Sequence, residues 1–197
     1  MLKVGITGGI GSGKTTVCKI FETLGIPVYY ADLRAKEIMN SDAEVILQVK
    51  QLFGEDAYSK SGELNRKFIA EKAFDNKDLL QKLNAIVHPA VFQDTLVWFQ
   101  SHQDKPYTLY EAAIMFESGS YKFLDKVITV FAPLEDRIER TMKRDKLNKE
   151  EVMERINKQM PEEEKMKRAD FVIYNDYSQP LIEQVLTIHR HIILICK

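Results

Sequence analysis

Long apolar runs are absent, because no stretch approaches the roughly 18 residues that a helix needs to cross a membrane. A surplus of charge is also absent: 28 Lys and Arg stand against 29 Asp and Glu, so no overall basic field favours nucleic acid. Cysteine is rare, and Cys18 and Cys196 form neither a CxxC pair nor a disulfide framework. The first residues, MLKVGITGG, run into a strand pattern and have neither the apolar core nor the small-residue cleavage site expected of a secretory leader. These absences predict a cytoplasmic protein whose partners are neither membranes nor nucleic acids.

Alternating strand and helix patterns are what the chain does have. Short apolar runs rich in β-branched and aromatic residues indicate strands buried on both faces, the pattern of a parallel sheet. Helical patterns separate these runs, which predicts an α/β protein with three layers, α/β/α. The expected five-stranded parallel sheet is formed by residues 2–7, 26–30, 107–115, 127–131 and 171–174.

The segment between the second and third strands is far longer than one crossover helix. It is helical in pattern throughout, with one helix capped by Ser41, another that contains Leu83 and a third that begins at Pro89. A segment of this size is too long for a connector. We interpret residues 32–105 as a helical insert that binds an acceptor molecule.

A second helical segment, residues 133–168, follows the fourth strand. One helix begins at Pro133, a further helix is capped by Asn148, and Pro161 interrupts it. Charges are dense here and core residues are few, as expected of a mobile lid. The predicted organisation is a core of residues 1–31, 106–132 and 169–197, the insert 32–105 after strand two and the lid 133–168 after strand four.

A phosphate-binding loop is the strongest motif of the chain. GGIGSGKTT, residues 8–16, fits G-x-x-x-x-G-K-[ST] and lies between a strand and a helix, as this P-loop motif requires. Its glycines let backbone N–H groups turn toward phosphate oxygens, and the helix N-terminus adds partial positive charge. Lys14 can reach the β- and γ-phosphates, and the Thr15 hydroxyl can bind Mg²⁺. The motif predicts an ATP–Mg²⁺ site formed by Gly11, Ser12, Gly13, Lys14, Thr15 and Thr16.

The P-loop alone leaves the class open between a kinase, a nucleotide-driven switch and a module that only holds nucleotide. No N-K-x-D segment is present to read a guanine base, which argues against a regulatory GTPase. No apolar strand ends in the usual Mg²⁺-supporting Asp, and the nearest carboxylates are Glu111 and Glu117. This pattern favours a kinase of a small molecule over a motor ATPase.

Asp32 follows the second strand, at the sheet edge where ligands bind in open α/β sheets. As an N-cap, its carboxylate would bond the first free amides of the next helix. As a general base, it would accept the proton of an acceptor hydroxyl during phosphoryl transfer. Because the P-loop is expected at the same edge, the catalytic role is favoured, and the two roles are compatible.

Three arginines of the expected lid, Arg137, Arg140 and Arg144, share one helix face at i, i+3 and i+7. Guanidinium groups that converge can stabilise a transferring phosphoryl group. The alternative is a solvated face, because acidic residues are interleaved with the arginines and can pair with them.

With these features in place, the chain resembles the dephospho-CoA kinase family over nearly its whole length. The segment LNAIVHP beside a P-loop is quite specific to that family, whereas IMFESG alone is not. The matching segments are GITGGIGSGKTT, Ala31-Asp32, ELNRKFIAEKAF, LNAIVHPAV, IMFESG, RTMKRD and ADFVIYN.

The resemblance implies ATP-dependent phosphorylation of the ribose 3′-hydroxyl of dephospho-CoA, the last step of coenzyme A synthesis. The catalytic Asp of the family corresponds to Asp32 and its lid arginine to Arg140. The resemblance also places Asn175 on the nucleotide side, and Arg66 and His88 near the acceptor.

Several positions depart from the family pattern. Tyr30 replaces the first Asp of Asp-Ala-Asp, so Asp32 acts without a second carboxylate. Lys36 replaces an Arg and loses its planar fork. Ala113 replaces a Pro, and Tyr177 replaces a Gly two residues beyond the nucleotide-side Asn, which leaves the adenine-side backbone in question.

The sequence therefore predicts a P-loop kinase in which Lys14 and Arg140 stabilise the transferring phosphoryl group while Asp32 deprotonates the acceptor. One alternative is a kinase of another small-molecule hydroxyl or of a nucleoside monophosphate, against which LNAIVHP argues. The other is a non-catalytic nucleotide-binding regulatory protein, which has no use for a lid with aligned arginines. A homo-oligomer is compatible with the sequence, which leaves the oligomeric state open.

Overall fold

The computed structural model describes residues 1–74 and 76–196, apart from the side chains of residues 74 and 77. The chain forms two compact units. The first, here called the P-loop unit, comprises Met1–Tyr30 and His102–Lys197, and the second, the helical unit, comprises Ala31–Ser101.

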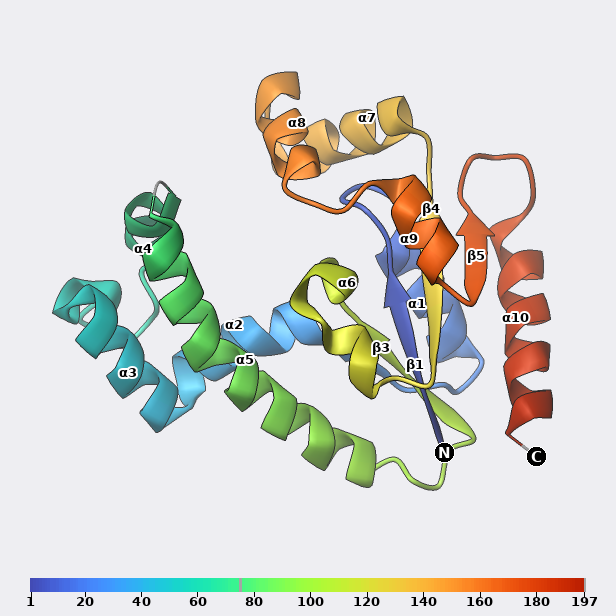
Figure 1. Cartoon of the computed structure of the whole chain (residues 1–197), viewed down its shortest axis with the longest axis horizontal. Coiled ribbons are helices and arrows are strands. Elements are labelled where there is room, and N and C mark those ends of the chain that lie inside the picture. Colours follow the sequence, from blue (N-terminus) through green and yellow to red (C-terminus); the bar gives the residue numbers. More distant parts are fainter. Residues whose placement is uncertain (75, 197) are drawn as a thin grey trace. The chain divides into compact units, whose positions relative to one another are not determined.

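The P-loop unit is built on a five-stranded sheet in which every pairing is parallel, as predicted (Figure 1). The strand order is β2-β3-β1-β4-β5. β1 (Leu2–Thr7) is central, between β3 (Tyr107–Glu111) and β4 (Lys126–Phe131). The edges are β2 (Val28–Tyr30) and β5 (Phe171–Tyr174). This arrangement places the segment that follows β1 at the middle of the carboxyl edge, where open α/β sheets bind ligands.

The third strand is shorter than the apolar run that predicted it. β3 ends at Glu111, and the apolar residues that follow lead into the short helix α6 (Met115–Ser118). Met115 and Phe116 are buried there, so one apolar run supplies two elements. Periodicity over a short apolar run cannot separate these cases.

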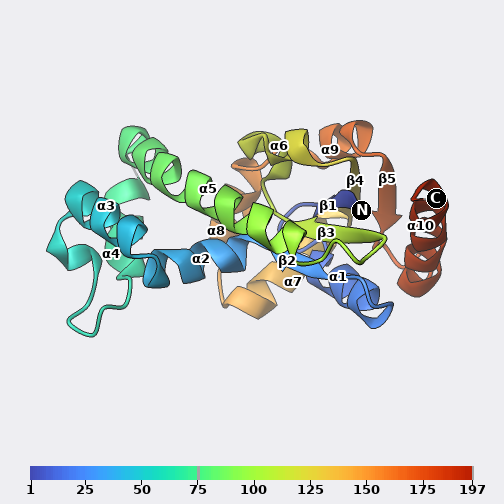
Figure 2. The same ribbon diagram turned by 90° about the horizontal axis from the view of Figure 1, so that it is seen from below.

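Helices cover both faces of the sheet (Figures 1 and 2). α1 (Lys14–Thr23) and α10 (Leu181–Ile195) pack together on one face, while α6 and α9 (Glu162–Arg168) lie on the other. Full burial stabilises each large apolar side chain by about 1.5–3 kcal/mol. The core under α1 and α10 includes Val4, Ile6, Leu109, Ile128 and Ile173 of the strands with Val17, Phe21, Val185 and Ile192 of the helices.

In the segment after β4, helices begin after Pro133 and Asn148, as predicted, whereas the helix capped by Asn148 ends at Asn157, before Pro161. α7 (Leu134–Asp145) begins after Pro133, and α9 begins after Pro161. Between them, α8 (Lys149–Asn157) opens with a capping box in which Asn148 and Glu151 bond each other's backbone N–H groups. A one-turn helix, η2 (Ser120–Phe123), lies between α6 and β4.

The helical unit consists almost entirely of helices. The longest, α5, contacts α2, α3 and α4, and an isolated antiparallel bridge joins Tyr58 to Leu64. The elements are α2 (Ala31–Ser41), α3 (Ala43–Phe53), η1 (Glu55–Ala57), α4 (Arg66–Phe74) and α5 (Lys77–Gln100).

Pro89 does not begin a helix, contrary to the prediction, because it lies inside α5. A proline in a helix interior removes one backbone hydrogen bond and normally kinks or ends the helix. Val87 and Val91 flank it and are both buried. Burial of this apolar stripe keeps the helix continuous through the proline, a tertiary effect that local sequence does not show.

The predicted cap of the next helix was wrong by one residue. Ser41 is the last residue of α2, and Asp42 caps α3 instead. Its Oδ1 accepts hydrogen bonds from the backbone N–H groups of Glu44, at 2.9 Å, and Val45, at 3.0 Å. Aspartate and serine cap equally well, so adjacent candidates are not separated by sequence.

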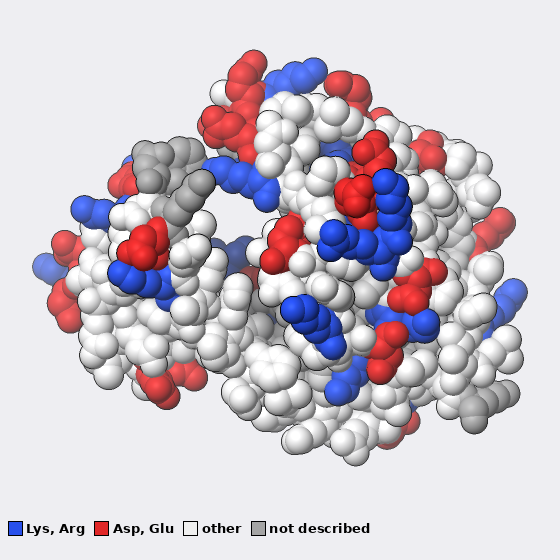
Figure 3. Space-filling model, viewed as in Figure 1, with Lys and Arg blue, Asp and Glu red and all other residues white. Residues whose placement is uncertain are grey.

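Acidic and basic side chains are interspersed over the face of the molecule that Figure 3 shows. This mixture accords with the formal net charge of −1. In the part of the chain that the structure describes, no helix has both the length and the apolar character of a membrane span.

Candidate active site

The P-loop follows β1 directly, and α7 packs against its outer side. Gly11 has a φ of +77°, a region that costs most L-residues energy. A Cβ on Gly11 would lie 2.7 Å from the Thr141 hydroxyl oxygen and would also meet the Arg137 carbonyl oxygen. Glycine is thus required here by the packing of α7 as well as by the turn.

Lys14 is the first residue of α1, and its side chain is buried. Its Nζ donates hydrogen bonds to the Gly8 carbonyl, at 2.9 Å, and to the Gly9 carbonyl, at 3.3 Å. The ammonium group is therefore held against the inner face of the loop, at the positive end of the α1 dipole. This is the position from which a lysine can bind the phosphates that the loop holds.

Two hydroxyl groups of the loop fit a nucleotide with its metal. Ser12 Oγ is buried and has no hydrogen-bond partner among the described residues, while the Thr15 side chain is exposed at the start of α1. Across the described residues, no group of three or more His, Cys, Asp or Glu is arranged to hold a metal ion. A single exposed threonine hydroxyl suits Mg²⁺, which usually takes few protein ligands and shares phosphate oxygens and water.

Glu111, named from the sequence only as one of the two nearest carboxylates, is a further candidate site residue. It ends β3 and is buried, in register with Ile6 of β1 and Tyr30 of β2. The expected third strand ran past it, so its place at the carboxyl edge was hidden. Burial, together with the charge of Glu111, raises the pKa of the Cys18 thiol, which makes Cys18 an inert core residue.

Asn175 joins the end of β5 to the P-loop. Its backbone N–H donates to the Phe131 carbonyl of β4, at 2.8 Å. Its side-chain Nδ2 donates to the Ser12 carbonyl, also at 2.8 Å, and packs against Gly13. The last strand thus supports the turn of the loop that begins α1.

Arg140 of α7 reaches the same corner. Its Nη2 donates to Asp136 Oδ2, at 3.1 Å, and to the Asn175 carbonyl, at 3.3 Å. Its Nη1 is buried without a hydrogen-bond partner in the described part of the chain. A guanidinium held by two contacts with an unused donor is suited to binding an anion.

The three arginines of α7 do not converge. Arg137 is buried and donates from Nε to the Ile10 carbonyl, at 3.0 Å. Arg144 is exposed and pairs with Asp145, at 2.7 Å. Arg144 thus lies on a solvated face, and Arg140 shares its guanidinium between the interleaved Asp136 and the Asn175 carbonyl.

The three predicted site residues of the helical unit are exposed. Asp32 is the second residue of α2, Arg66 begins α4, and His88 lies within α5. Among the described residues, none of these side chains has a hydrogen bond, an ion pair or a ring contact. Asp32 lies inside the helix and makes no capping bond, so the cap interpretation finds no support in its geometry.

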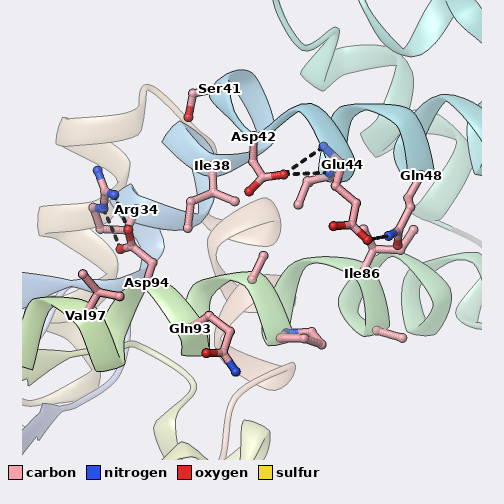
Figure 4. Close-up of a pocket in the computed structure, with 14 residues that line it drawn as sticks. Arg34, Ile38, Ser41, Asp42, Glu44, Gln48, Ile86, Gln93, Asp94 and Val97 are labelled. Carbon is pink, nitrogen blue, oxygen red and sulfur yellow. Dashed lines mark hydrogen bonds and ion pairs between the residues drawn. The ribbon is translucent and has the colours of Figure 1, made fainter.

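A pocket of about 720 Å³ opens in the helical unit between α2, α3 and α5 (Figure 4). Ile38, Val45 and Val97 contribute apolar surface to it. Arg34 and Asp94 form a two-armed ion pair at one end, through contacts of 2.5 and 3.0 Å. The pocket thus offers an apolar surface beside charged and polar groups, the usual make-up of a small-molecule site.

Comparison with known proteins decides the family. The sequence model of the dephospho-CoA kinase family matches residues 2–180. The chain belongs to the dephospho-CoA kinase family. A dephospho-CoA kinase of Bacteroides fragilis is 40% identical over 185 residues, which cover 94% of this chain and 90% of the relative. Membership confirms the predicted family and makes the chain a kinase.

Solved structures agree with this assignment. A protein from Thermus thermophilus superimposes with a TM-score of 0.85 at 36% identity, covering 96% of each chain. A dephospho-CoA kinase from Campylobacter jejuni gives a TM-score of 0.74 at 29% identity, covering 99% of this chain and 98% of that one. The P-loop kinase fold predicted from the sequence is thereby confirmed.

The structure shows how three of the residues that depart from the family pattern are placed. Tyr177 adopts a φ of +64°, the region that glycine favours, so the backbone keeps a glycine-like turn despite the side chain. Its exposed ring lies 5.4 Å from the Arg140 guanidinium, a cation–π distance. Tyr30, which replaces a carboxylate, bonds Glu22 of α1 at 3.1 Å, and the Lys36 side chain is exposed.

Proposed function

We propose that the chain transfers the γ-phosphate of ATP to the ribose 3′-hydroxyl of dephospho-CoA, giving coenzyme A. The observation that carries this proposal is the family match over residues 2–180, which includes the P-loop, Asp32 and Arg140. The family implies ATP and dephospho-CoA as small-molecule substrates.

In this proposal, the P-loop holds the ATP phosphates through Gly11, Ser12, Gly13, Lys14, Thr15 and Thr16. The unpartnered hydroxyl of Ser12 and the exposed hydroxyl of Thr15 support this role. Mg²⁺, bound by Thr15 and the phosphates, would neutralise charge on the β- and γ-oxygens. Glu111, at the carboxyl edge of the sheet, is suited to accept a hydrogen bond from a water molecule on the metal.

The helical unit would bind the acceptor. Asp32, Arg66 and His88 each offer an exposed polar group that no described residue already uses. Arg66 is suited to a phosphate of dephospho-CoA, and the pocket between α2, α3 and α5 to the pantetheine arm.

The reaction we propose is a single in-line displacement. Asp32 accepts the proton of the 3′-hydroxyl as its oxygen forms a bond to the γ-phosphorus. The bond from the γ-phosphorus to the bridging oxygen breaks, and ADP leaves with the electron pair. Lys14 and Arg140 stabilise the charge that accumulates on the phosphoryl oxygens and the leaving group.

Residues 133–168 would act as a lid that closes over the nucleotide and excludes water, which otherwise accepts the phosphoryl group wastefully. We also propose a cytoplasmic location, which the two free thiols support. A homo-oligomer stays a prediction that analytical ultracentrifugation would check.

Acceptor-dependent ADP release by the full chain with ATP and Mg²⁺ tests the proposal. Dephospho-CoA is compared with a panel of nucleosides, nucleoside monophosphates and sugars, and with no acceptor. We expect strong stimulation by dephospho-CoA alone. Stimulation by another acceptor would keep the kinase but change its substrate, and no stimulation by any acceptor would leave only a nucleotide-binding protein.

A further inference from the structure

Four charged side chains lie together beside Gly9 and Ile10 of the P-loop. Lys165 of α9 is fully buried, and the side chains of Arg137 and Glu162 are 5% and 10% exposed. Glu117 of α6 completes the group, which we call the charge cluster. Two cations and two anions make it neutral overall.

The charges of this cluster approach one another without forming close hydrogen bonds. Lys165 Nζ lies 3.6 Å from Glu162 Oε1 and 3.8 Å from Glu117 Oε1, while Arg137 Nη1 lies 3.8 Å from Glu162 Oε1. Lys165 Nζ and both carboxylate oxygens of Glu162 are buried with no hydrogen-bond partner among the described residues. Ion pairs of this kind contribute little to stability, because desolvation offsets their attraction. Stability alone therefore does not account for the cluster.

The cluster touches the P-loop backbone directly. Arg137 Nε donates to the Ile10 carbonyl, and the neighbouring N–H of Ile10 donates to Gln159 Oε1, at 2.8 Å. A Cβ on Gly9 would lie 2.7 Å from Glu162 Oε1 and would also meet the Arg137 guanidinium. Both polar groups of the Ile10 backbone are thus held from the lid side.

The same loop residues hold Lys14, whose Nζ bonds the Gly8 and Gly9 carbonyls. Glu117 extends the support, because its Oε1 accepts a hydrogen bond from the Met160 backbone N–H, at 2.7 Å, next to Gln159. A continuous path of contacts therefore runs from Lys165 and Glu162 to the backbone that orients the phosphate-binding lysine.

We propose that Lys165 and Glu162 are positioning residues for nucleotide binding, acting through Arg137 on Gly9 and Ile10. The inference rests on the proposed function only in taking the P-loop ligand to be ATP. Removal of the Lys165 charge would leave a net negative charge directly beside the phosphate-binding backbone, and it would free Glu162 to draw Arg137 away from Ile10. Small displacements of positioned groups have large effects on phosphoryl transfer.

The test removes the positive charge of Lys165, the negative charge of Glu162, or both. Lys165→Met, Glu162→Gln and the double variant are compared with wild type for ADP affinity by calorimetry, for KM of each substrate and for thermal unfolding. We expect Lys165→Met to weaken ADP binding about tenfold and the KM for dephospho-CoA to change less than about twofold. The double variant, neutral again, should recover ADP affinity to within about threefold of wild type.

Lys167→Met is the matched control, because Lys167 lies on the same helix but is 71% exposed and forms an exposed ion pair with Glu164. It should leave ADP affinity within about twofold of wild type. If Lys165→Met does not fold, Lys165→Gln takes its place in the cycle, because the coupling of the two charges is obtained only when both single variants are compared with the double variant.

Wild-type ADP affinity in a folded Lys165→Met variant would overturn the inference, as would a double variant whose losses simply add. These outcomes are separate from failure of the proposed function. ADP binding is measured without an acceptor. A wild-type chain that does not phosphorylate dephospho-CoA would therefore refute the proposed function, whereas the role of the charge cluster would still be decided by the ADP affinities of the variants.

Discussion

The P-loop unit and the helical unit differ in how their candidate site residues are held. In the P-loop unit, Lys14, Arg140 and Asn175 bond backbone carbonyls and are at least half buried. In the helical unit, Asp32 and His88 are exposed, and no described residue pairs with them. The first unit is therefore organised for its ligand in advance, whereas the second leaves its polar groups to be used by a ligand.

This difference separates two kinds of sensitivity to mutation. A preorganised loop should lose both stability and nucleotide affinity when its packing is disturbed. Exposed, unpaired residues should lose activity with little change in stability, because nothing in the folded chain depends on them.

The largest effect is expected at Asp32. Asp32→Asn should lower kcat by about 10²–10⁴-fold, because an amide cannot take up the proton of the acceptor hydroxyl. The free energy of unfolding should change by less than about 1 kcal/mol. Steady-state kinetics and urea unfolding measure the two. Asp78→Asn, another exposed acid of the helical unit, should keep wild-type kcat. Near-wild-type turnover in Asp32→Asn would remove its catalytic role.

The next largest effect on activity is expected at Arg140. Arg140→Met removes the guanidinium with the unpartnered donor, and we expect kcat/KM for ATP to fall about 10²–10³-fold. Arg144→Met is the control on the same helix, and it should change this value less than about twofold because its ion pair is exposed. Equal losses in the two variants would mean that Arg140 acts only through helix stability.

Gly11 tests the preorganised loop. Gly11→Ala should cost about 2–4 kcal/mol and abolish ADP binding, since strain adds to a clash with α7. Gly25→Ala has a similar φ, +79° against +77°, but its Cβ would meet nothing within 4 Å. Gly25→Ala should lower the free energy of unfolding by only about 1–2 kcal/mol and leave ADP binding intact. Equal losses of unfolding free energy in the two variants, measured by urea unfolding, would contradict the packing argument.

The pocket of the helical unit gives a smaller, selective effect. Ala90→Trp places a large side chain at its wall, and we expect the KM for dephospho-CoA to rise about tenfold while the KM for ATP stays unchanged. A rise in the KM for ATP instead, or no change in either, would exclude the pocket from acceptor binding.

The smallest effect concerns pH and stability. Burial lowers the pKa of His189, which bonds the Tyr107 hydroxyl at 2.8 Å. The unfolded chain then binds the proton more readily, so stability should fall slightly as pH drops below about 6.5, the usual histidine pKa. Thermal unfolding at pH 7.5 and 5.5 should show a smaller shift in His189→Gln than in wild type. An equal shift would assign the pH dependence elsewhere.

The sequence was most informative where backbone geometry determines function. The P-loop and the helix starts at Pro133 and Asn148 follow from local rules of turn and cap formation, and the parallel sheet follows from apolar runs that alternate with helical patterns. These predictions were confirmed in the P-loop unit, since each depends on a few adjacent residues.

What the sequence did not show depends on contacts between distant segments. Arg137 shares a helix face with Arg140 and Arg144 in the sequence, yet packing buries it, together with Lys165, beside the P-loop. Glu111 was hidden by an apolar run that continues past the end of its strand. The roles of Arg66 and His88 rest on family resemblance, because an exposed residue without partners carries no structural signature of its own.

The most direct test of the central claim is to identify the product that the full chain makes from dephospho-CoA, ATP and Mg²⁺. Mass spectrometry and phosphorus NMR would identify the phosphorylated product, and its amount would be compared with the amount of ADP released. The account predicts one new phosphomonoester on the ribose 3′-oxygen for each ADP formed. ADP without a phosphorylated acceptor, or a phosphate on any other hydroxyl, would contradict it.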